Sequence, residues 1–585
     1  MSLLDIDKLT IRYAEKPAVD GLSFSVDRGE AVGLVGESGS GKSQTALAIL
    51  GLLPVDAGVA GSIKVSGTEV IGAGEATLNR IRARRVGIVF QDPMQALNPF
   101  VRIGKQLRQV VLRHEIAAGP AADERVVETL ARVGLPDPQR QYRAYPHQLS
   151  GGMRQRAMLA QALIAEPELL IADEPTTALD VTVQAQILAL LEEIRHDTAL
   201  LLITHDLGVV AGYCERMLVL ERGRLVEHGP TRDVFAAPAH DHTQALIDAA
   251  PRIDQAPAGQ PQPGAEVLDI DSARVVFKVP GEGTLEAVRG VDLTLTAGET
   301  VAVVGESGSG KSSLVRAVLG LLPMGGGRVT YCGNVLPADV QERAQSTRRD
   351  LQLVFQDPAG SLNPQMRVED IVAEPLIVHE PRSSLAERRS RVVAMLEHVG
   401  LGDEYLHRHP HQLSGGQAQR VAIARALILE PKVLICDEAV AALDGTVRQQ
   451  ILRLLQRVQA ETGLAIVFIT HDLAVVRTIS HRVCVMYLGR LVELAENAAL
   501  FANARHPYTR ALLAAVPVPD PAAPGGRALL SGEIPSAVSP PRGCAFHPRC
   551  PHAIDTCRTA LPEPRQIGDA TVACHRADEP SLQAG

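Results

Sequence analysis

The sequence predicts an α/β protein built from two copies of one domain and followed by a small Cys-rich appendage. The octapeptide GESGSGKS occurs at residues 36–43 and again at residues 305–312. Further along the chain, the Asp-Glu pairs that end at Glu174 and at Glu438 lie 264 residues apart, close to the 269-residue spacing of the octapeptides. A nearly constant spacing over such a length indicates that a whole domain is duplicated.

Composition marks the predicted boundaries between these parts. Residues 251–264, PRIDQAPAGQPQPG, are rich in Pro, Gln and Gly and lack apolar periodicity, which is typical of a linker. We therefore expect one domain over residues 1–250 and the second over residues 265–515. Residues 516–585 begin with a Pro-rich stretch and have no counterpart in the first half.

The overall composition limits the class of protein. The chain has 585 residues, 46% of them hydrophobic, with no Trp and 3% aromatic residues, so its cores are expected to be aliphatic. The net charge of -9 argues mildly against nucleic acid as the main partner. No run of about 18 apolar residues is present, and the N-terminus resembles a strand rather than a signal peptide. A cytosolic chain without a membrane span of its own is expected.

Each octapeptide stands between an apolar strand and a helix, the context of a phosphate-binding loop. In the first copy the strand is expected over residues 30–35 and the helix over 44–53. Glycines allow backbone N–H groups to converge on phosphate oxygens, and the helix N-terminus adds positive charge. Repetition disfavours a chance glycine turn. The predicted nucleotide-binding residues are Gly36, Ser38, Gly39, Ser40, Gly41, Lys42, Ser43 and Gln44, and in the second copy Gly305, Ser307, Gly308, Ser309, Gly310, Lys311, Ser312 and Ser313.

Two acidic residues follow an apolar strand in each copy. Asp173 and Asp437 are expected to hold Mg²⁺ together with the loop hydroxyls of Ser43 and Ser312. The next residue, Glu174 or Glu438, is expected to orient and polarise the attacking water, which makes this pair the predicted catalytic acids.

Two further polar residues recur at matching positions. His205 and His471 each end an apolar strand in a Thr-His-Asp sequence, and they are predicted catalytic residues beside the γ-phosphate. A lone His is more often structural, but the repetition favours a functional role. Gln91 and Gln356, in VFQDP, are predicted ligands of Mg²⁺ or its water; a loop amide that caps the turn is an equal alternative.

The sequences LSGGM (residues 149–153) and LSGGQ (413–417) resemble the signature motif of ATP-binding cassette (ABC) ATPases. All the motifs above, together with TALD and AALD around Asp180 and Asp444, occur in that family's order. The chain is similar to a fused pair of cassette subunits from a bacterial importer of the dipeptide/oligopeptide/nickel type. This narrower resemblance rests on QALNP, on SLNP, and on the ends HDHTQALIDAAP and HPYTRALLAAVP.

The resemblance implies cassettes with a RecA-like core, an antiparallel β lobe and a helical subdomain. It also implies that the cassettes pack head to tail, so that each ATP lies between one phosphate loop and the signature of the other cassette. Helix N-termini at the signatures can bind a γ-phosphate. Tyr13 and Phe277 are expected to stack on adenine, or alternatively to be core aromatics. The implied signature contacts are Ser150, Gly151, Gly152, Ser414, Gly415 and Gly416.

Three residues depart from the family pattern. Met153 replaces the usual Gln of the signature, and Ala439 and Ala441 replace the Pro and Ser that usually follow the catalytic acid. None of these changes removes a charged or metal-binding group. We therefore expect both sites to hydrolyse ATP, with an asymmetric pair as the alternative.

The tail contains four of the eight cysteines, Cys544, Cys550, Cys557 and Cys574. Their spacing matches neither a usual zinc site nor a bacterial ferredoxin. The importer family often carries a similar tail, and some members resemble iron–sulfur proteins there. A [4Fe–4S] cluster is therefore expected, with zinc, or unligated or redox-paired thiols, as alternatives. His547, His552 and His575 are spare ligands for zinc. The other cysteines, Cys214, Cys332, Cys436 and Cys484, are expected to be inert core residues, mostly in apolar strands.

The resemblance implies an ATPase that powers peptide import at the cytoplasmic face of the inner membrane. Its expected partners are two transmembrane permease subunits and, indirectly, an external solute-binding protein. Glutathione, nickel complexes and other small solutes remain alternative cargoes. A soluble tandem cassette protein that acts on ribosomes or DNA is the alternative of another class, disfavoured by the short linker and acidic charge. An exporter is disfavoured because no membrane span is fused to the cassettes.

Overall fold

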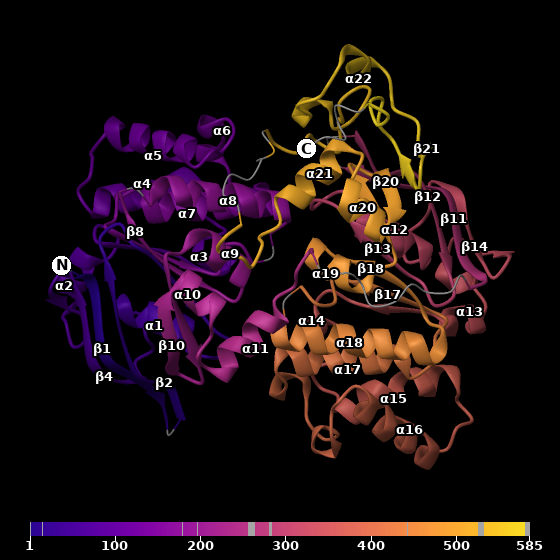
Figure 1. Ribbon diagram of the computed structural model, residues 1–585, viewed down its shortest axis with the longest axis horizontal. Coiled ribbons are helices and arrows are strands. Elements are labelled where there is room, and N and C mark those ends of the chain that lie inside the picture. The colour runs from indigo at the N-terminus through magenta and orange to yellow at the C-terminus, as the bar shows by residue number, and fades with distance from the viewer. Residues whose placement is uncertain are drawn as a thin grey trace.

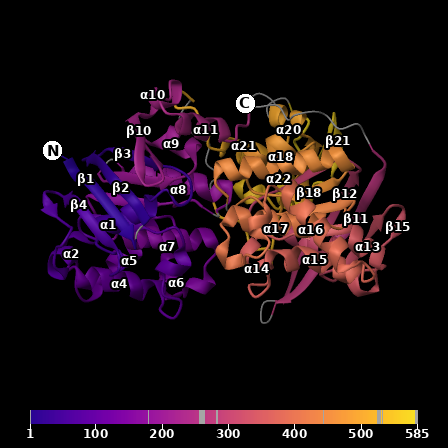
Figure 2. The same ribbon diagram turned by 90° about the horizontal axis from the view of Figure 1, so that it is seen from below.

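The two halves of the chain form two α/β lobes that lie side by side, and the tail covers one end of the second lobe (Figure 1). The computed structural model describes residues 2–14, 16–177, 179–195, 197–254, 264–279, 283–441, 443–523, 530 and 532–579. Residues 255–263 of the predicted linker lie outside the described residues. The view from below shows the same separation of the lobes (Figure 2).

The first lobe is built on a mixed sheet of six strands with a predominantly parallel core. Its order is β10 (Arg224–Pro230), β9 (Arg216–Glu221), β3 (Ala31–Val35), β8 (Ala199–Thr204), β7 (Leu169–Asp173) and β6 (Val86–Val89), and only β10 runs antiparallel to its neighbour. Alternate residues of the buried strands face two different cores. Leu200 and Leu202 belong to one apolar cluster, and Leu201 and Ile203 belong to the other. Burial of both faces explains why these strands are continuous apolar runs.

A second, antiparallel sheet and a set of helices complete the first lobe. The sheet has the order β2 (Lys16–Asp27), β1 (Ser2–Tyr13), β4 (Gly58–Val65) and β5 (Thr68–Glu69). The helices are α1 (Lys42–Ile49), α2 (Glu75–Ile81), α3 (Pro93–Ala96), α4 (Ile103–Arg113), α5 (Pro120–Arg132), α6 (Pro138–Arg143), η1 (Pro146–Gln148), α7 (Gly151–Leu163), α8 (Val181–Ile194), α9 (Leu207–Tyr213), α10 (Thr231–Ala236) and α11 (Asp241–Ala249).

The second lobe repeats this arrangement. Its antiparallel sheet has the order β12 (Gly283–Thr296), β11 (Glu266–Val279), β14 (Gly326–Tyr331) and β15 (Asn334–Val335). Its main sheet begins with β16 (Leu351–Val354), β17 (Val433–Asp437), β18 (Ala465–Ile469), β13 (Thr300–Val304), β19 (Arg482–Tyr487) and β20 (Arg490–Glu496). This is the strand order of the first lobe when that sheet is followed from β6 to β10. The predicted duplication is therefore confirmed at the level of strand order.

The helices of the second lobe follow a similar order. They are α12 (Lys311–Val318), η2 (Val340–Glu342), α13 (Gln345–Asp350), α14 (Pro358–Ser361), α15 (Val368–His379), α16 (Leu385–His398), η3 (Asp403–Tyr405), η4 (Pro410–Gln412), α17 (Gly415–Leu427), α18 (Gly445–Thr462), α19 (Leu473–Ile479), α20 (Asn497–Asn503) and α21 (Pro507–Ala514). Relative to the first lobe, η2 is added before α13 and the short turn η3 replaces α6. Across the described ranges, every helix is too short or too polar to span a lipid bilayer.

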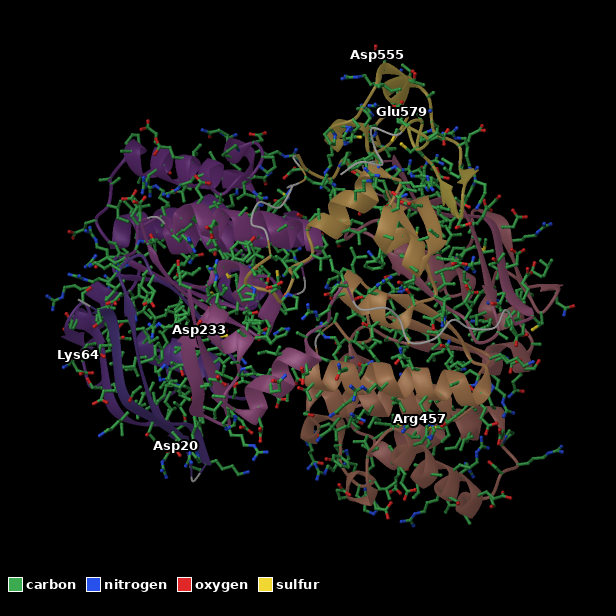
Figure 3. The ribbon with its side chains drawn as sticks, in the orientation of Figure 1. Asp20, Lys64, Asp233, Arg457, Asp555 and Glu579 are labelled. Carbon is green, nitrogen blue, oxygen red and sulfur yellow. The ribbon has the colours of Figure 1, made fainter. Side chains whose placement is uncertain are left out.

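The tail is joined to the second lobe more closely than its composition predicts. It contains η5 (His547–Arg549), α22 (Asp555–Thr559), β21 (Arg565–Ile567) and β22 (Ala570–Val572). Strand β22 pairs antiparallel with β20, which extends the main sheet of the second lobe to eight strands. Phe546 and Val572 are buried in one apolar cluster with Tyr487 and Tyr508 of that lobe. The tail therefore shares the core of the second lobe, whereas Asp555 and Glu579 lie at its outer surface (Figure 3).

Each lobe also contacts the other through helices at its C-terminal end. Helix α11 of the first lobe packs against α18 of the second, and α21 of the second packs against α8 of the first. Val181 and Ala185 of α8 belong to the apolar cluster that contains the buried residues of the tail. The junction between the lobes is therefore partly apolar, and the tail takes part in it.

Candidate functional site

The two phosphate loops adopt the same conformation in the two lobes. Each begins after a buried strand, β3 or β13, and each ends at a helix whose N-cap glycine, Gly41 or Gly310, has a φ of 100° or 98°. A Cβ on Gly36 would lie 2.3 Å from the carbonyl oxygen of Leu220, so this position requires glycine. The predicted loops are thus present as strand–loop–helix units.

The loop lysines are held by their own loops. Lys42 Nζ donates hydrogen bonds to the carbonyl oxygens of Gly36 and Glu37, both at 2.8 Å. Lys311 Nζ repeats them with Gly305 at 2.8 Å and Glu306 at 2.9 Å. Burial lowers the pKa of both lysines, although nearby carboxylates oppose the shift. Each lysine is thus a buried point charge beside a ring of backbone N–H groups, suited to a polyphosphate.

The predicted acids meet the loops at the carboxyl ends of their strands. Ser312 Oγ donates a hydrogen bond to Asp437 Oδ1 at 3.0 Å, and Ser43 bonds to Asp173 in the first lobe. Burial, aided by the adjacent glutamate, raises the pKa of each aspartate, and the serine hydrogen bond opposes this shift. A hydroxyl beside a buried carboxylate is a donor set that suits Mg²⁺. The residues predicted to hold the ion therefore fit it.

The predicted catalytic glutamate of the first lobe is contacted by two other predicted residues. Gln91 Nε2 donates to Glu174 Oε2 at 2.8 Å, and His205 Nδ1 lies 3.2 Å from Glu174 Oε1. Burial raises the pKa of Glu174, but hydrogen bonds from His205 and Thr177 and nearby positive charges outweigh it, so the net pKa is lowered. The carboxylate is therefore held ionised, as a proton acceptor requires.

The second lobe brings together the equivalent three residues. Gln356 Nε2 donates to Glu438 Oε2 at 2.7 Å, and His471 Nδ1 lies 3.6 Å from Glu438 Oε1. Burial again raises the pKa of Glu438, and the hydrogen bond and charge of His471 lower it further than burial raises it. Glu174 and Glu438 also share a positive φ, 48° and 49°, which is strained for a non-glycine residue. The same strain at the same position supports a common role for the two glutamates.

Each signature segment forms the exposed N-terminal end of a largely buried helix. Ser150 Oγ caps α7 by accepting a hydrogen bond from the Met153 N–H at 3.3 Å. Ser414 caps α17 in the same way, and Gln417 Oε1 also accepts from the Ser414 N–H, which completes a capping box. Met153 has no side-chain acceptor, so the first signature lacks that second bond. Within the described ranges, no hydrogen bond or ion pair joins Ser150 or Ser414 to the phosphate loop of the other lobe.

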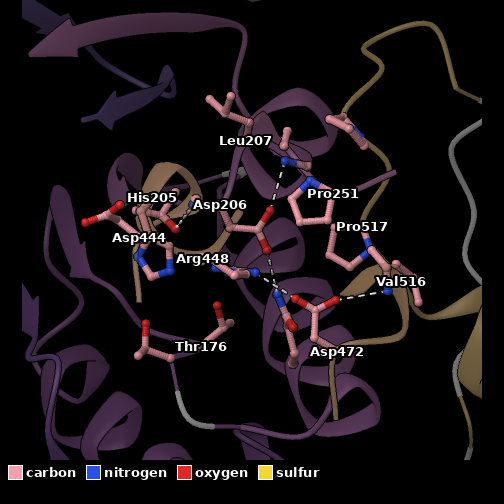
Figure 4. Close-up of a pocket in the computed structure, with 18 of the residues that line it drawn as sticks. Thr176, His205, Asp206, Leu207, Pro251, Asp444, Arg448, Asp472, Val516 and Pro517 are labelled. Atoms are coloured by element: carbon pink, nitrogen blue, oxygen red, sulfur yellow. Dashed lines mark hydrogen bonds and ion pairs between the residues drawn. The ribbon is translucent and has the colours of Figure 1, made fainter. Parts of the chain in front are cut away.

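The segments after the catalytic acids do cross between the lobes. Asp444 acts electrostatically on Lys42, and Asp180 acts on Lys311, each opposing the fall in pKa that burial causes. A pocket at this crossing is lined from both lobes, with His205 and Asp206 on one side and Asp472 on the other (Figure 4). This reciprocal electrostatic action is consistent with the head-to-tail packing that the family resemblance implies.

The two predicted adenine-stacking aromatics are half-buried at the antiparallel sheets. Tyr13 packs against the apolar cluster of its sheet, and its hydroxyl donates a hydrogen bond to Gln44 Oε1. Phe277 packs against the corresponding cluster in the second lobe. Each therefore has a core contact and an exposed part, and the stacking role remains a prediction.

The four tail cysteines converge on one small pocket. Cys544, Cys550, Cys557 and Cys574 line it together with His547, His552 and His575. Burial raises the pKa of the Cys544 and Cys550 thiols to about 11. Among the described side chains, no group of three or more His, Cys, Asp or Glu is arranged to hold a metal ion. The described residues therefore support neither a zinc site nor the predicted [4Fe–4S] cluster, and the cluster remains a prediction.

The expectation for the other cysteines is wrong in two details. Cys436 and Cys484 are buried in β17 and β19, as expected. Cys214 is buried but caps the end of α9 rather than lying in a strand. Cys332 is exposed at the turn between β14 and β15 with a φ of 46°, because the turn places it outside the sheet.

Sequence reasoning missed a buried ion pair at the second phosphate loop. Arg549 of the tail contacts Glu306, the second residue of GESGSGKS, through both guanidinium Nη atoms. Thr182 of the first lobe and Tyr508 of the second also bond to Glu306. No local signal predicts these contacts, because Glu37 has the same octapeptide around it.

Comparisons with known proteins point in one direction. The family model described as ABC transporter matches residues 19–177 and 288–441, and the model of the oligopeptide/dipeptide transporter C-terminal region matches residues 226–272 and 492–557. The glutathione import ATP-binding protein GsiA of Escherichia coli (strain K12) is 42% identical over 92% of this chain and 93% of its own length. The peptidoglycan transport ATP-binding protein YejF of Agrobacterium fabrum is 44% identical over 88% of this chain and 96% of its own. A dimeric structure of the ATP-binding cassette MJ0796, bound to ADP and phosphate, is 31% identical, covers 39% of this chain and 98% of its own, and has a TM-score of 0.37.

Proposed function

This chain belongs to the ABC transporter family of ATP-binding subunits with the oligopeptide/dipeptide C-terminal region, and we propose that it powers peptide import across the cytoplasmic membrane. It is an ABC-type ATPase, with ATP as substrate and Mg²⁺ as the expected cofactor. Peptides are the proposed cargo, with glutathione, itself a small peptide, as a candidate that the GsiA relatives suggest. Nickel complexes are a further candidate, because the sequence resembles importers of that type as well.

The main observation behind this proposal is that both lobes contain the same four features: a phosphate loop, a catalytic glutamate, a glutamine and a histidine. In each lobe a buried lysine, an ionised glutamate, a glutamine and a histidine meet at the carboxyl edge of one sheet. Mg²⁺, when bound, supplies charge that neutralises phosphate oxygens. Positioning and electrostatics of this kind account for most of phosphoryl-transfer catalysis.

We assign the catalytic step to the glutamates. Glu174 accepts the proton of the attacking water, with Gln91 fixing one of its oxygens and His205 the other. Lys42 and the loop N–H groups bind the β- and γ-phosphates, and Ser43 and Asp173 provide the ligands for Mg²⁺. The equivalent residues of the second lobe carry out the same steps.

We further propose that each ATP is completed by the signature of the opposite lobe. The reciprocal action of Asp180 and Asp444 on the loop lysines supports a head-to-tail pair. The free N–H groups at the starts of α7 and α17 are suited to a γ-phosphate once the lobes close. In this scheme the cassettes are residues 1–250 and 265–515, and residues 516–585 extend the second.

The proposed permease contact lies at a groove beside the glutamine loop of the second lobe. Leu321, Phe355 and Val378 are exposed there, by 49%, 40% and 60% respectively. Phe355 directly precedes Gln356, which bonds to the catalytic Glu438. A helix of a membrane subunit that docks on this apolar groove would contact Phe355, the residue next to Gln356, and could thereby affect the position of the catalytic Glu438. Importer ATP-binding subunits work with membrane permeases. We propose two permease subunits as the partners of this chain at the cytoplasmic face of the membrane, and an external solute-binding protein that delivers the cargo to them.

We also propose a [4Fe–4S] cluster in the tail, because four thiols surround one pocket. Thiolates are the usual ligands of such clusters. Iron and sulfide analysis of protein purified without oxygen, with its visible absorption spectrum, tests this. About four irons and four sulfides per chain are expected, and colourless protein that contains zinc would contradict the cluster. Cys550→Ser should lower the iron content, whereas Cys332→Ser at the exposed turn is the matched control.

Transport by a reconstituted complex tests the main proposal. The chain would be co-expressed with the permease-type proteins that a search of its neighbouring genes identifies, and placed in vesicles with labelled di- and tripeptides, glutathione or nickel. ATP-dependent peptide uptake that is lost in the Glu174→Gln/Glu438→Gln double variant is expected. Failure to bind any permease, together with co-purification with ribosomes or DNA, would contradict the proposal and favour a soluble tandem cassette protein.

A further inference from the structure

The second phosphate loop contains one of the most buried ion pairs in the described chain. The side chain of Glu306 is 1% exposed and that of Arg549 is 2% exposed. Arg549 Nη1 lies 2.6 Å from Glu306 Oε2, and Nη2 lies 2.9 Å from Oε1, so the contact is bidentate. Such geometry fixes the plane of the carboxylate as well as its position.

Glu306 is also held through its backbone. Its N–H donates a hydrogen bond to the Tyr508 hydroxyl at 2.9 Å, and its carbonyl oxygen accepts one from Lys311 Nζ at 2.9 Å. Thr182, in the first helical turn after Asp180 of the first lobe, bonds to its carboxylate. One residue therefore connects the loop lysine, the tail and the opposite lobe.

Packing keeps Arg549 in place. It ends the η5 turn that follows Phe546, a residue only 1% exposed. The ring of Phe546 meets that of Tyr487 edge-on, with centroids 5.4 Å apart, and it contacts the ring of Tyr508 at the same distance. Burial opposes a charge on Arg549, but Glu306 outweighs it and raises the arginine pKa. The tail thus presents a fixed cation to the loop.

The first phosphate loop has no equivalent support. Glu37 is half-buried, and among the described residues no hydrogen bond or ion pair reaches its carboxylate. His242 stands at the position that corresponds to Tyr508. The tail that supplies Arg549 follows the second lobe alone. The same eight residues therefore lie in two different environments.

We propose that Arg549 is a positioning residue of the second ATP site, and that through Glu306 it gives this site a higher nucleotide affinity than the first. This inference rests on the proposed function, because it presumes that both loops bind ATP. In this proposal Arg549 acts through Glu306 and not on the nucleotide itself. It holds the Glu306 carboxylate, and hence the backbone segment that carries Lys311, so less ordering remains to be done on binding. Loss of the pair would leave a buried carboxylate with the Thr182 hydroxyl as partner but without a cation, and would release the loop.

Nucleotide binding to each site separately tests the proposal in the full-length chain. Lys42→Ala silences the first loop, so that Mg-nucleotide binding, followed with a fluorescent ATP analogue, reports the second; Lys311→Ala does the reverse. Arg549→Met should weaken binding about tenfold in the Lys42→Ala background, within the usual range of coupling between sites. In the Lys311→Ala background the change should be below about twofold. Arg549→Lys, which keeps the charge but not the fork, should restore only part of the affinity.

A matched control separates positioning from stability. Arg482 forms another largely buried pair in the same lobe, with Glu299 at the opposite end of β13. Arg482→Met should lower the melting temperature without weakening nucleotide binding at the second site. If Arg549→Met prevents folding, the milder Glu306→Gln should show the same selective loss.

The outcomes are distinguishable. An equal effect of Arg549→Met on both sites, or no effect on either in folded protein, overturns the inference. An effect of Arg482→Met as large as that of Arg549→Met also overturns it. If neither single-lysine variant binds nucleotide before Arg549 is changed, the proposed function itself fails.

Discussion

The two phosphate loops have one sequence and one conformation but different surroundings. Lys42 and Lys311 make the same hydrogen bonds within their loops, to within 0.1 Å. Glu37, however, is half-buried and unpaired among the described side chains, whereas Glu306 is buried and paired with Arg549. The octapeptide therefore determines the shape of the loop, and residues far away determine how firmly the loop is held.

The largest expected effect concerns what the two sites share. Replacing both catalytic acids, Glu174→Gln and Glu438→Gln together, should lower ATP turnover by about 10³-fold, since groups that transfer protons contribute about 10²–10⁴. Steady-state hydrolysis measures it. Each single variant should also lose most of the activity. If one single variant keeps full turnover, only one of the two sites hydrolyses ATP, which would contradict the view that the lobes share the same chemistry.

The next effect should appear in stability and only in the second lobe. Arg549→Met leaves the Glu306 carboxylate buried without a cation beside it, and loss of the cation costs about 3–5 kcal/mol in comparable pairs. Denaturant unfolding, with hydrogen exchange to separate the lobes, measures this loss. Glu37→Gln is the matched change in the first loop and should alter stability by less than about 0.5 kcal/mol, as for partly exposed sites. Equal destabilisation by both would contradict the difference between the loops.

Acid should also weaken the second lobe through His506. This buried residue caps α21 by accepting a hydrogen bond from the Tyr508 N–H, and burial lowers its pKa to about 3. Protonation then favours the unfolded chain, in which the pKa is about 6.5. The contribution of neutral His506 to the free energy of unfolding is fully present above a pH of about 6.5. It decreases by up to about 1.4 kcal/mol per pH unit as the pH falls from there toward the pKa of the folded state.

Unfolding measured between neutral and acidic pH, with His506→Asn as the variant, tests this account. Asn can still cap the helix but does not titrate, so the variant should lose part of the acid sensitivity. Glu493 is the neighbouring titratable group: its carboxylate accepts a hydrogen bond from the backbone N–H of His506, and burial raises its pKa. An unchanged pH profile in the variant would show that His506 is not the group responsible.

The smallest expected effect concerns the signatures. Met153→Gln should restore the capping bond that Gln417 makes at the second signature, and capping bonds contribute about 0.5–2 kcal/mol. We expect the first lobe to melt at a slightly higher temperature. The ATP affinity of each site, measured with the other loop silenced, should not change. Gln417→Met should produce the opposite change, and a loss of stability in Met153→Gln would contradict the assignment.

Much of the site could be predicted from the sequence because it is local. The loop, the acid that ends a strand and the histidine that ends another each follow from a few adjacent residues, and parallel strands bring them together. The four-residue spacing of Val126 and Leu130 also predicts one buried face of a helix, and both residues are buried in α5. Gly134, with a φ of 72°, follows the end of that helix, where a glycine is favoured.

The remaining features depend on distant parts of the chain. Arg549 and Glu306 are 243 residues apart, and nothing in either neighbourhood indicates the other. The pairing of β22 with β20 was also unexpected, because a Pro-rich tail with few apolar residues does not suggest a strand in a large sheet. Phe546 and Val572 are buried in the apolar cluster of the second lobe, and this burial stabilises the tail there.

The most direct test of the unequal loops is the same substitution at the same position of each. Glu37→Gln and Glu306→Gln would be compared by the Mg-nucleotide affinity of their own sites, each measured with the other loop silenced. Glu306→Gln should weaken its site about tenfold and Glu37→Gln less than about twofold. Equal losses at the two sites would contradict the account, because they would show that the octapeptide alone sets how each loop binds.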